Sequence, residues 1–297
     1  MERGNTVSMI VKRLSYGIGA EIQGVDLRAP LAQETIDAIR KAWVENCIVL
    51  FRGQELTPQQ HIDFSARFGP LEDHKALYKS RHPEYPQIFI VTTRPNADGT
   101  PSNTRETGVN WHSDLSYTLR PATGSLLYCL EIPEVGGDTR FANMYLAYET
   151  LSDGFKRLIE PLQAVHSYAW AVHDTAAGRD PAYMKAHIEV NPPVAQPIVR
   201  VHPETGRKAL YVSEGTTTHI AGMTREESLP ILQWLYTHSV RPEFTYRHQW
   251  RRGDLIMWDN RSAMHQALRD RVPGTYRHMH RTTILGEPSG VLAAEAA

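Results

Sequence analysis

Cysteine is scarce in this chain of 297 residues, and its scarcity narrows the class of protein. Only Cys47 and Cys129 are present, both in apolar stretches where a buried, free thiol is the usual state. Two such residues support neither a disulfide framework nor a cysteine-based zinc site. The chain also lacks an apolar run of about 18 residues, so we expect no membrane-spanning helix.

An excess of charge of either sign is missing as well. The chain holds 32 Lys and Arg against 33 Asp and Glu, for a net charge of −1, and it has no basic run. This composition argues against binding to nucleic acid or to a membrane surface. Residues 1–8 lack the apolar segment of a signal peptide, so we expect a disordered leader and a cytoplasmic protein. We also expect a homo-oligomer.

Short strands dominate the chain from residue 70 onward, whereas helices fall in three groups. Expected helices cover residues 31–43, 57–69, 144–159 and 224–239, and expected strands cover residues 47–51, 87–91, 123–132, 198–202, 208–212, 244–250, 255–258 and 276–285. Residues 172–197 are rich in proline and are expected to be irregular. We therefore expect one mainly β domain over residues 9–290, a barrel or sandwich with helices packed outside, and a C-terminal tail over residues 291–297.

His112 and Asp114 form the first candidate for a site, because they are two residues apart in a segment that reads as extended. Side chains at i and i+2 of a strand point to one face, so one imidazole and one carboxylate can reach a common point. These are two of the three ligands of a 2-His-1-carboxylate iron site. His61 and Asp63 have the same spacing, but a capping box at Thr57 places them on a helix. There they diverge by roughly 200°, so we expect His61 to be structural.

His265 is the favoured third ligand among the other histidines of the chain. It follows the apolar run Leu255–Trp258 and lies just past the end of an expected core strand, where the scaffold can fix a functional side chain. The polar segment 93–107, which precedes His112, is expected to be a flexible loop at the position where a lid would lie.

Arg277 and Arg281 would share one face of the last expected strand, about 13 Å apart. Arginine is rarely buried without a partner. Either this strand is an edge strand in solvent, or its face lines a cavity and each arginine meets an anion. The planar guanidinium suits a carboxylate or a sulfonate because it makes paired hydrogen bonds.

Together these motifs resemble the TauD/TfdA family of Fe(II)- and 2-oxoglutarate-dependent dioxygenases. The resemblance covers nearly the whole chain and rests on Gly19–Leu27, Phe51–Gln54, Phe68–Gly69, Trp111–Asp114, Gly136–Thr139, Trp258–Arg261, His265 and Arg277–Arg281. It implies a double-stranded β-helix (jelly-roll) core and O₂ as the oxidant. It also implies that His112, Asp114 and His265 bind Fe(II), and that Thr139 and Arg277 hold the distal carboxylate of 2-oxoglutarate.

The resemblance also bears on the primary substrate. In related enzymes that act on anions, the position of Arg281 meets the sulfonate or carboxylate, and His74 lies where the taurine enzymes keep a substrate-facing histidine. Val172 and Thr216 stand where those enzymes have aromatic residues, and Gly108 replaces an asparagine. These departures make taurine doubtful and suggest a larger or differently shaped anion. From the residues alone, His74 could instead be a surface loop residue.

The expected reaction is therefore hydroxylation of a small anionic organic substrate. A sulfonate, a sulfate ester, an aryloxyalkanoate and a carboxylate all stay open, and cleavage next to a heteroatom would accompany the release of succinate and CO₂. Two other functions stay open. A non-redox metal-dependent hydrolase or isomerase would keep the His-Asp-His set, and an anion-binding barrel would keep only the arginines.

Overall fold

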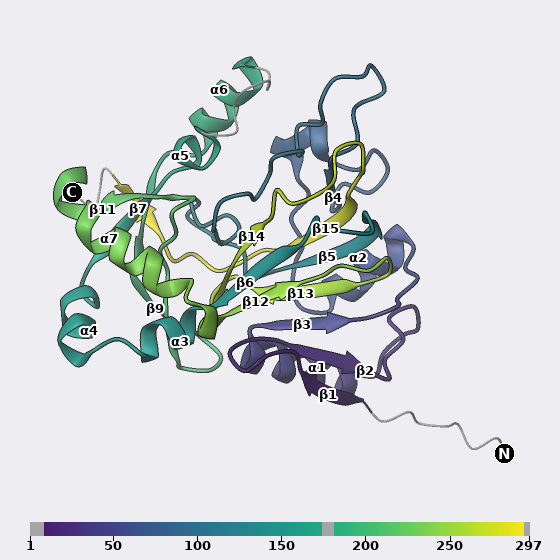
Figure 1. Ribbon diagram of the computed structural model, residues 1–297, viewed down its shortest axis with the longest axis horizontal. Coiled ribbons are helices and arrows are strands. Elements are labelled where there is room, and N and C mark those ends of the chain that lie inside the picture. The colour runs from purple at the N-terminus through teal and green to yellow at the C-terminus, as the bar shows by residue number, and fades with distance from the viewer. Residues whose placement is uncertain (1–8, 174–180, 294–297) are drawn as a thin grey trace.

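Seven strands form the larger sheet of the computed structural model, which describes residues 9–173 and 181–293. Their order is β1 (Ile10–Arg13), β2 (Ala20–Gln23), β3 (Ile48–Phe51), β13 (Leu255–Asp259), β5 (Gly124–Glu131), β15 (His278–Ile284) and β4 (Phe89–Thr92). All neighbours are antiparallel except β2 and β3 (Figure 1). The expected leader over residues 1–8 lies outside the described residues.

Smaller sheets complete the β structure. A three-stranded sheet has the order β12 (Thr245–His248), β6 (Thr139–Asn143) and β14 (Ala263–Ala267), and a four-stranded sheet has the order β11 (Thr217–Ile220), β7 (Gln163–His166), β8 (Val194–Pro197) and β16 (Val291–Leu292). The antiparallel pair of β9 (Val199–Val201) and β10 (Lys208–Leu210) confirms the two strands expected over residues 198–202 and 208–212. The first residues of the expected C-terminal tail thus pair with β8.

The alternation of side chains along β13 shows where the two cores lie. Ile256 and Trp258 belong to the inner cluster, together with Phe141 of β6, which fills the space between the larger sheet and the smaller ones. Met257 points the other way and packs with Trp43 in an outer cluster. Both faces of β13 are therefore buried, which explains why its sequence is almost continuously apolar.

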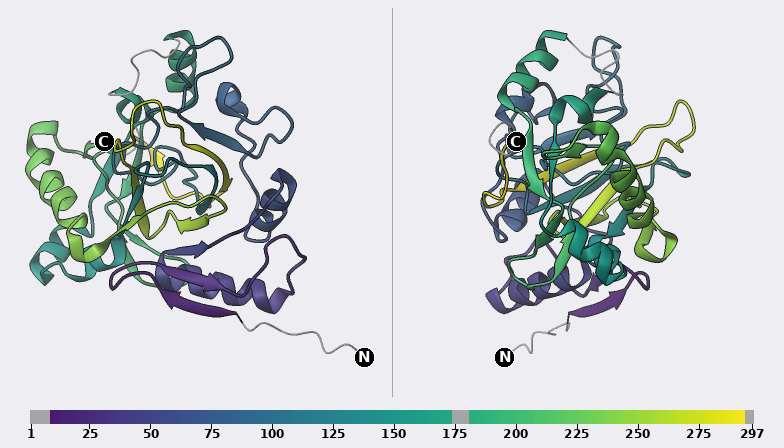
Figure 2. Two further views of the ribbon diagram at one scale, coloured as in Figure 1. Left: turned by 45° about the vertical axis from the view of Figure 1, so that its right-hand side comes forward. Right: turned by 90° about the vertical axis from the view of Figure 1, so that its left-hand side faces the viewer.

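Two helices cover the outer face of the larger sheet. α1 (Gln33–Asn46) and α2 (Pro58–Ala66) supply apolar side chains to the outer cluster. The capping box at Thr57 is confirmed, because its hydroxyl accepts a hydrogen bond from the N–H of Gln60 and the Gln60 side chain accepts one from the N–H of Thr57. In both views of Figure 2 the N-terminal strands and α1 lie together at one edge of the molecule.

The remaining helices of the described ranges follow α2 in the chain. They are α3 (Met144–Glu149), α4 (Asp153–Ile159), α5 (Tyr168–His173), α6 (Pro181–Val190), α7 (Arg225–Ser239) and the short 3₁₀ helices Lys75–Ser80 and Pro242–Phe244. Figure 1 shows α3, α4 and α7 gathered at one side, with α5 and α6 projecting beside them. No helix of the described ranges is long and apolar enough to span a membrane.

Three sequence predictions about elements are wrong. The single helix expected over residues 144–159 is broken, because Ser152 caps a second helix by accepting a hydrogen bond from the N–H of Phe155 at 3.3 Å. The segment 172–197, expected to be irregular, contains α6 and β8. His265, expected just past the end of a core strand, follows β13 but lies inside a further strand, β14, which was not predicted.

Candidate active site

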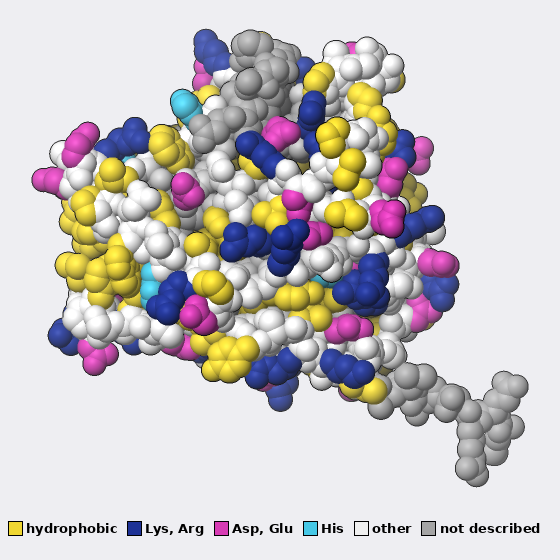
Figure 3. Space-filling view, in the orientation of Figure 1, with side chains coloured by type: hydrophobic (Ala, Val, Ile, Leu, Met, Phe, Trp, Pro, Cys, Tyr) yellow, Lys and Arg dark blue, Asp and Glu magenta, His cyan; other side chains and the backbone are white. Residues whose placement is uncertain are grey.

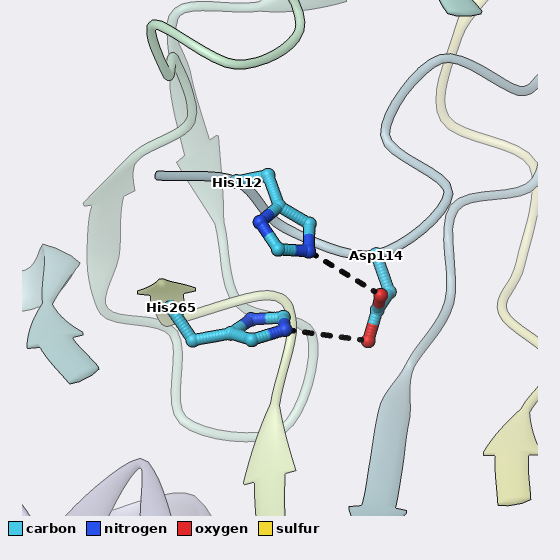
Figure 4. A group of neighbouring side chains, drawn as sticks. All are labelled: His112, Asp114 and His265. Atoms are coloured by element: carbon cyan, nitrogen blue, oxygen red, sulfur yellow. Dashed lines mark ion pairs between the residues drawn. The ribbon is translucent and has the colours of Figure 1, made fainter. Parts of the chain in front are cut away.

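His112, Asp114 and His265 converge on one point, as Figure 4 shows. His112 lies beside β14, and its backbone exchanges two hydrogen bonds with His265, at 3.0 and 2.9 Å. The Asp114 carboxylate faces both imidazoles, with Oδ1 3.8 Å from His112 Nε2 and Oδ2 4.0 Å from His265 Nε2. One potential ligand atom from each residue falls within 4.8 Å of the other two. The predicted clustering of these three side chains is therefore present.

The protonation of the three side chains suits a metal ion. Burial lowers the pKa of both His112 and His265, so the two imidazoles are neutral at pH 7. His112 Nδ1 lies 2.8 Å from the carbonyl oxygen of Asn110, which can only accept, so Nδ1 carries the proton and Nε2 keeps a free lone pair. Burial acts to raise the pKa of Asp114, but the Arg281 guanidinium above all, with the hydrogen bond from Ser125, holds that pKa below its usual value. Two neutral imidazoles and one carboxylate are the donor set of a non-haem Fe(II) site.

Gly108 allows the chain to pass close to this centre. Its φ of +77° is in the left-handed region, and a Cβ there would lie 3.1 Å from His112 Cε1. The carbonyl of Gly108 accepts a hydrogen bond from Ala267 N at 2.7 Å, so the segment leading to His112 runs along β14. A larger residue at position 108 would disturb both contacts.

Arg277 and Thr139 form a second group of candidate residues near the three ligands. Arg277 Nη2 donates to Thr139 Oγ1 at 3.3 Å, and Trp250 Nε1 donates to the same oxygen at 2.9 Å. Thr139 on β6 lies opposite Ala267 of β14, and Ala267 is two residues beyond His265. Thr139 and His265 are therefore diagonal neighbours, about 7–8 Å apart. A five-carbon diacid can bridge a separation of this size.

The guanidinium of Arg277 is a buried cation that still has bonding capacity. The residue is 7% exposed, and within the described part of the chain its Nε has no hydrogen-bond partner. Burial lowers the pKa of Arg277 to about 10, which leaves the group charged at pH 7. Burying such a charge is costly unless an anion meets it. This group therefore fits the distal carboxylate of 2-oxoglutarate.

A cavity opens beside the three ligands on the side of Arg281 and His74. Arg281 Nη1 donates to Asp114 Oδ1 at 2.7 Å, while its Nε has no partner among the described residues. His74 is only 3% exposed, so the alternative of a surface loop residue is wrong. Burial lowers the pKa of His74 to about 3, with a smaller contribution from Arg281. The wall of this cavity also includes Phe89, Leu115, Tyr117, Tyr168, Val172 and Thr216.

The other predictions about side chains have clear outcomes. His61 is buried on α2, within 3.3 Å of the Thr282 hydroxyl, whereas Asp63 is exposed, so these two do not form a site. Arg281 lies on a strand paired on both sides, which excludes a solvent-exposed edge strand. Sequence reasoning missed Ser125 and Asn260, which both contact Asp114. The only signal for Asn260 was its place in the Trp258–Arg261 motif.

Comparison with known proteins identifies the family. The model of the family described as taurine catabolism dioxygenase TauD, TfdA family, matches residues 10–283. The chain belongs to this family. The TauD/TfdA assignment confirms the prediction of a non-haem iron, 2-oxoglutarate-dependent dioxygenase with a jelly-roll core.

Individual relatives agree over most of the chain. The (S)-phenoxypropionate/alpha-ketoglutarate-dioxygenase of Sphingobium herbicidovorans is 35% identical over 260 residues, covering 86% of this chain and 87% of the relative. The alpha-ketoglutarate-dependent 2,4-dichlorophenoxyacetate dioxygenase of Cupriavidus pinatubonensis is 32% identical and covers 95% of this chain and 99% of the relative. A crystal structure of a taurine dioxygenase from Burkholderia xenovorans superposes with a TM-score of 0.78 at 34% identity, over 94% of this chain and 90% of that one.

Proposed function

We propose that His112, Asp114 and His265 bind Fe(II), and that Thr139 and Arg277 bind the distal carboxylate of 2-oxoglutarate. The observation that carries the proposal is the convergence of three potential ligand atoms within 4.8 Å of one another. When bound, iron and 2-oxoglutarate would supply the oxidation, in which the substrate, O₂ and 2-oxoglutarate yield the hydroxylated product, succinate and CO₂. The protein contributes orientation: Arg277 holds one end of the diacid, and the buried walls of the site limit the access of water.

We infer that the primary substrate is a small organic anion whose charged group meets Arg281 and His74. Support comes from the buried Arg281 guanidinium, with its Nε unpartnered among the described residues, and from His74 Nε2, which is buried and likewise lacks a partner there. The relatives are named for 2,4-dichlorophenoxyacetate and (S)-phenoxypropionate, and others for alkyl sulfates and sulfate esters. Hydroxylation of the carbon next to an ether or ester oxygen gives a product that collapses to a carbonyl compound and the free leaving group.

Among these classes the cavity wall favours an anion that carries an aryl ring. Phe89, Tyr117 and Tyr168 supply aromatic surface, and Val172 and Thr216 are smaller than the aromatic residues that the taurine enzymes are expected to have there. Aromatic side chains bind a ring by offset or edge-to-face contacts. The wall therefore supports an aryloxyalkanoate rather than taurine.

Each of the two alternative functions leaves one group of buried residues in the site unexplained. A non-redox hydrolase or isomerase would need the three metal ligands but not the buried Arg277 beside Thr139. An anion-binding barrel would need the arginines but not two neutral imidazoles around a carboxylate. The dioxygenase uses both groups, which is why we favour it.

The first test is succinate formation by the pure protein with Fe(II), ascorbate, O₂ and 2-oxoglutarate. Slow uncoupled decarboxylation is expected, and EDTA should abolish it. Asp114→Ala should abolish both decarboxylation and Fe(II) binding, since the carboxylate ligand is lost; unchanged activity in this variant would remove the assignment of the three ligands. An oxygen-uptake screen over aryloxyalkanoates, sulfate esters, sulfonates and carboxylates then identifies the substrate class.

The location and the assembly state are also proposals. We propose one cytoplasmic domain over residues 9–290, without a nucleic-acid or membrane partner. The near-neutral net charge and the two free, buried cysteines support this proposal. We also propose that the protein is a homo-oligomer. In Figure 3, charges of both signs are interspersed, and hydrophobic side chains gather over α4 and α7. Exposed Leu158, Leu229 and Trp234 belong to these two helices. Sedimentation equilibrium would measure the assembly state.

A further inference from the structure

Asp114 is held from two directions by residues that are not candidate metal ligands. Its backbone N–H donates to Asn260 Oδ1 at 3.0 Å, and its Oδ2 accepts a hydrogen bond from Ser125 Oγ at 2.7 Å. Ser125 lies on β5, and Asn260 lies in the turn between β13 and β14. Both residues are 0% exposed. One contact thus comes from a core strand, and the other comes from the short turn that joins two buried strands.

The direction of each hydrogen bond follows from the donors involved. The indole N–H of Trp258 can only donate, and it donates to Asn260 Oδ1 at 3.0 Å, alongside the N–H of Asp114. Two donors on one oxygen fix the orientation of the amide, so Asn260 Nδ2 is the donor to Ser125 Oγ at 3.2 Å. The Ser125 oxygen therefore receives one hydrogen bond, and its only proton is directed to the carboxylate of Asp114.

Arg281 also contacts Asp114, but it cannot have the same task. It donates to Oδ1 at 2.7 Å, and it lines the cavity that is proposed to receive the substrate anion. An entering anion competes with Asp114 for its guanidinium. Ser125 is not part of the cavity wall, so its hydrogen bond to Oδ2 does not depend on whether substrate is present.

We propose that Ser125, oriented by Asn260, is a positioning residue that holds the Asp114 carboxylate in place for the metal ion. The inference rests on the proposed function, because it takes Asp114 as a metal ligand. A carboxylate that is already fixed loses less side-chain freedom when the ion binds. Hydrogen bonds to metal ligands from neighbouring residues commonly change the metal affinity by about 10–100-fold.

The test is metal binding by Ser125→Ala, measured without turnover. Anaerobic titration with Co(II) or Fe(II), followed by absorption spectroscopy, gives the dissociation constant directly. We expect this constant to rise by about 10-fold or more in Ser125→Ala. Ser125→Cys, which keeps a weaker donor at the same position, should give an intermediate value.

Ser228→Ala is the matched control. Ser228 is also 0% exposed and also makes two hydrogen bonds, to Thr224 O and from Ile220 N, but it lies at the start of α7. It should keep the wild-type dissociation constant. An unchanged constant in Ser125→Ala, or an equal rise in Ser228→Ala, would overturn the positioning role while leaving the dioxygenase intact. Failure of the wild-type protein to bind either ion would instead overturn the proposed function, and this inference with it.

Discussion

The buried side chain of Arg277 gives the most specific prediction about binding of the co-substrate 2-oxoglutarate. It is charged, enclosed and bonded only weakly to Thr139, at 3.3 Å. Arg277→Leu should remove a charged hydrogen bond to 2-oxoglutarate worth about 1.5–3 kcal/mol. The KM for 2-oxoglutarate should then rise roughly 10- to 150-fold. Initial rates of succinate formation over a range of 2-oxoglutarate concentrations measure this change.

The control for Arg277→Leu is its affinity for Fe(II). Because Arg277 is not a candidate ligand, the variant should bind Fe(II) as the wild type does. Arg277→Lys should be intermediate, since it keeps the charge but loses the planar fork. A wild-type KM in Arg277→Leu would show that the carboxylate binds elsewhere.

Arg281 makes a different prediction, because it faces the substrate cavity. Arg281→Ala should lower kcat/KM for the anionic substrate by at least about 10-fold, the scale of one charged hydrogen bond. Uncoupled decarboxylation should persist, since Ser125 still donates to Asp114 at 2.7 Å. The comparison of oxygen uptake with and without substrate separates the two effects. Equal kcat/KM in variant and wild type would clear Arg281 of this role.

Among the helices, the cap of α2 allows a test of stability apart from function. Thr57 lies on the surface, and its hydroxyl accepts the N–H of Gln60 at 3.2 Å. Thr57→Ala should lower the free energy of unfolding by about 1 kcal/mol. Urea denaturation of the metal-free protein measures the loss, and Thr57→Ser should restore most of it. A difference in succinate formation between Thr57→Ala and wild type would be unexpected, because α2 covers the outer face of the sheet.

Elements with local signals could be predicted from the sequence, whereas those that depend on distant partners could not. The capping box at Thr57 marks a helix start that the structure contains, and the helix expected from residue 224 also begins at a capping box, formed by Thr224 and Glu227. β14 was missed because its residues, Ala263–Ala267, show no alternation and become a strand only by pairing with β6. His265 was still identified, because the apolar strand β13 precedes it closely. Ser125 carried no signal, since its role exists only through the pairing of β13 with β5.

At the scale of the whole molecule, the β-sheets bury histidines that the unfolded chain would leave in water. Burial lowers the pKa of His61, of His74 and of His166 to about 3 in each case, and that of His280 to about 4. The corresponding value in an unfolded chain is about 6.5. Between these values the unfolded chain binds more protons than the folded one, so acid favours unfolding.

The sign of the pH dependence follows directly. The pKa values of these histidines are lower in the folded protein than in the unfolded chain. Their contribution to the free energy of unfolding is therefore fully present above about pH 6.5 and is lost as the pH falls below that value. Each such histidine contributes at most about 1.4 kcal/mol per pH unit in that range. Urea denaturation of the metal-free protein at pH 7.5, 6.5 and 5.5 should therefore show a steep fall in the free energy of unfolding. His166→Asn should reduce the slope of the free energy of unfolding against pH, because one buried site no longer titrates. If the wild-type protein had the same free energy of unfolding at pH 7.5 and 5.5, that result would contradict the burial of neutral histidines.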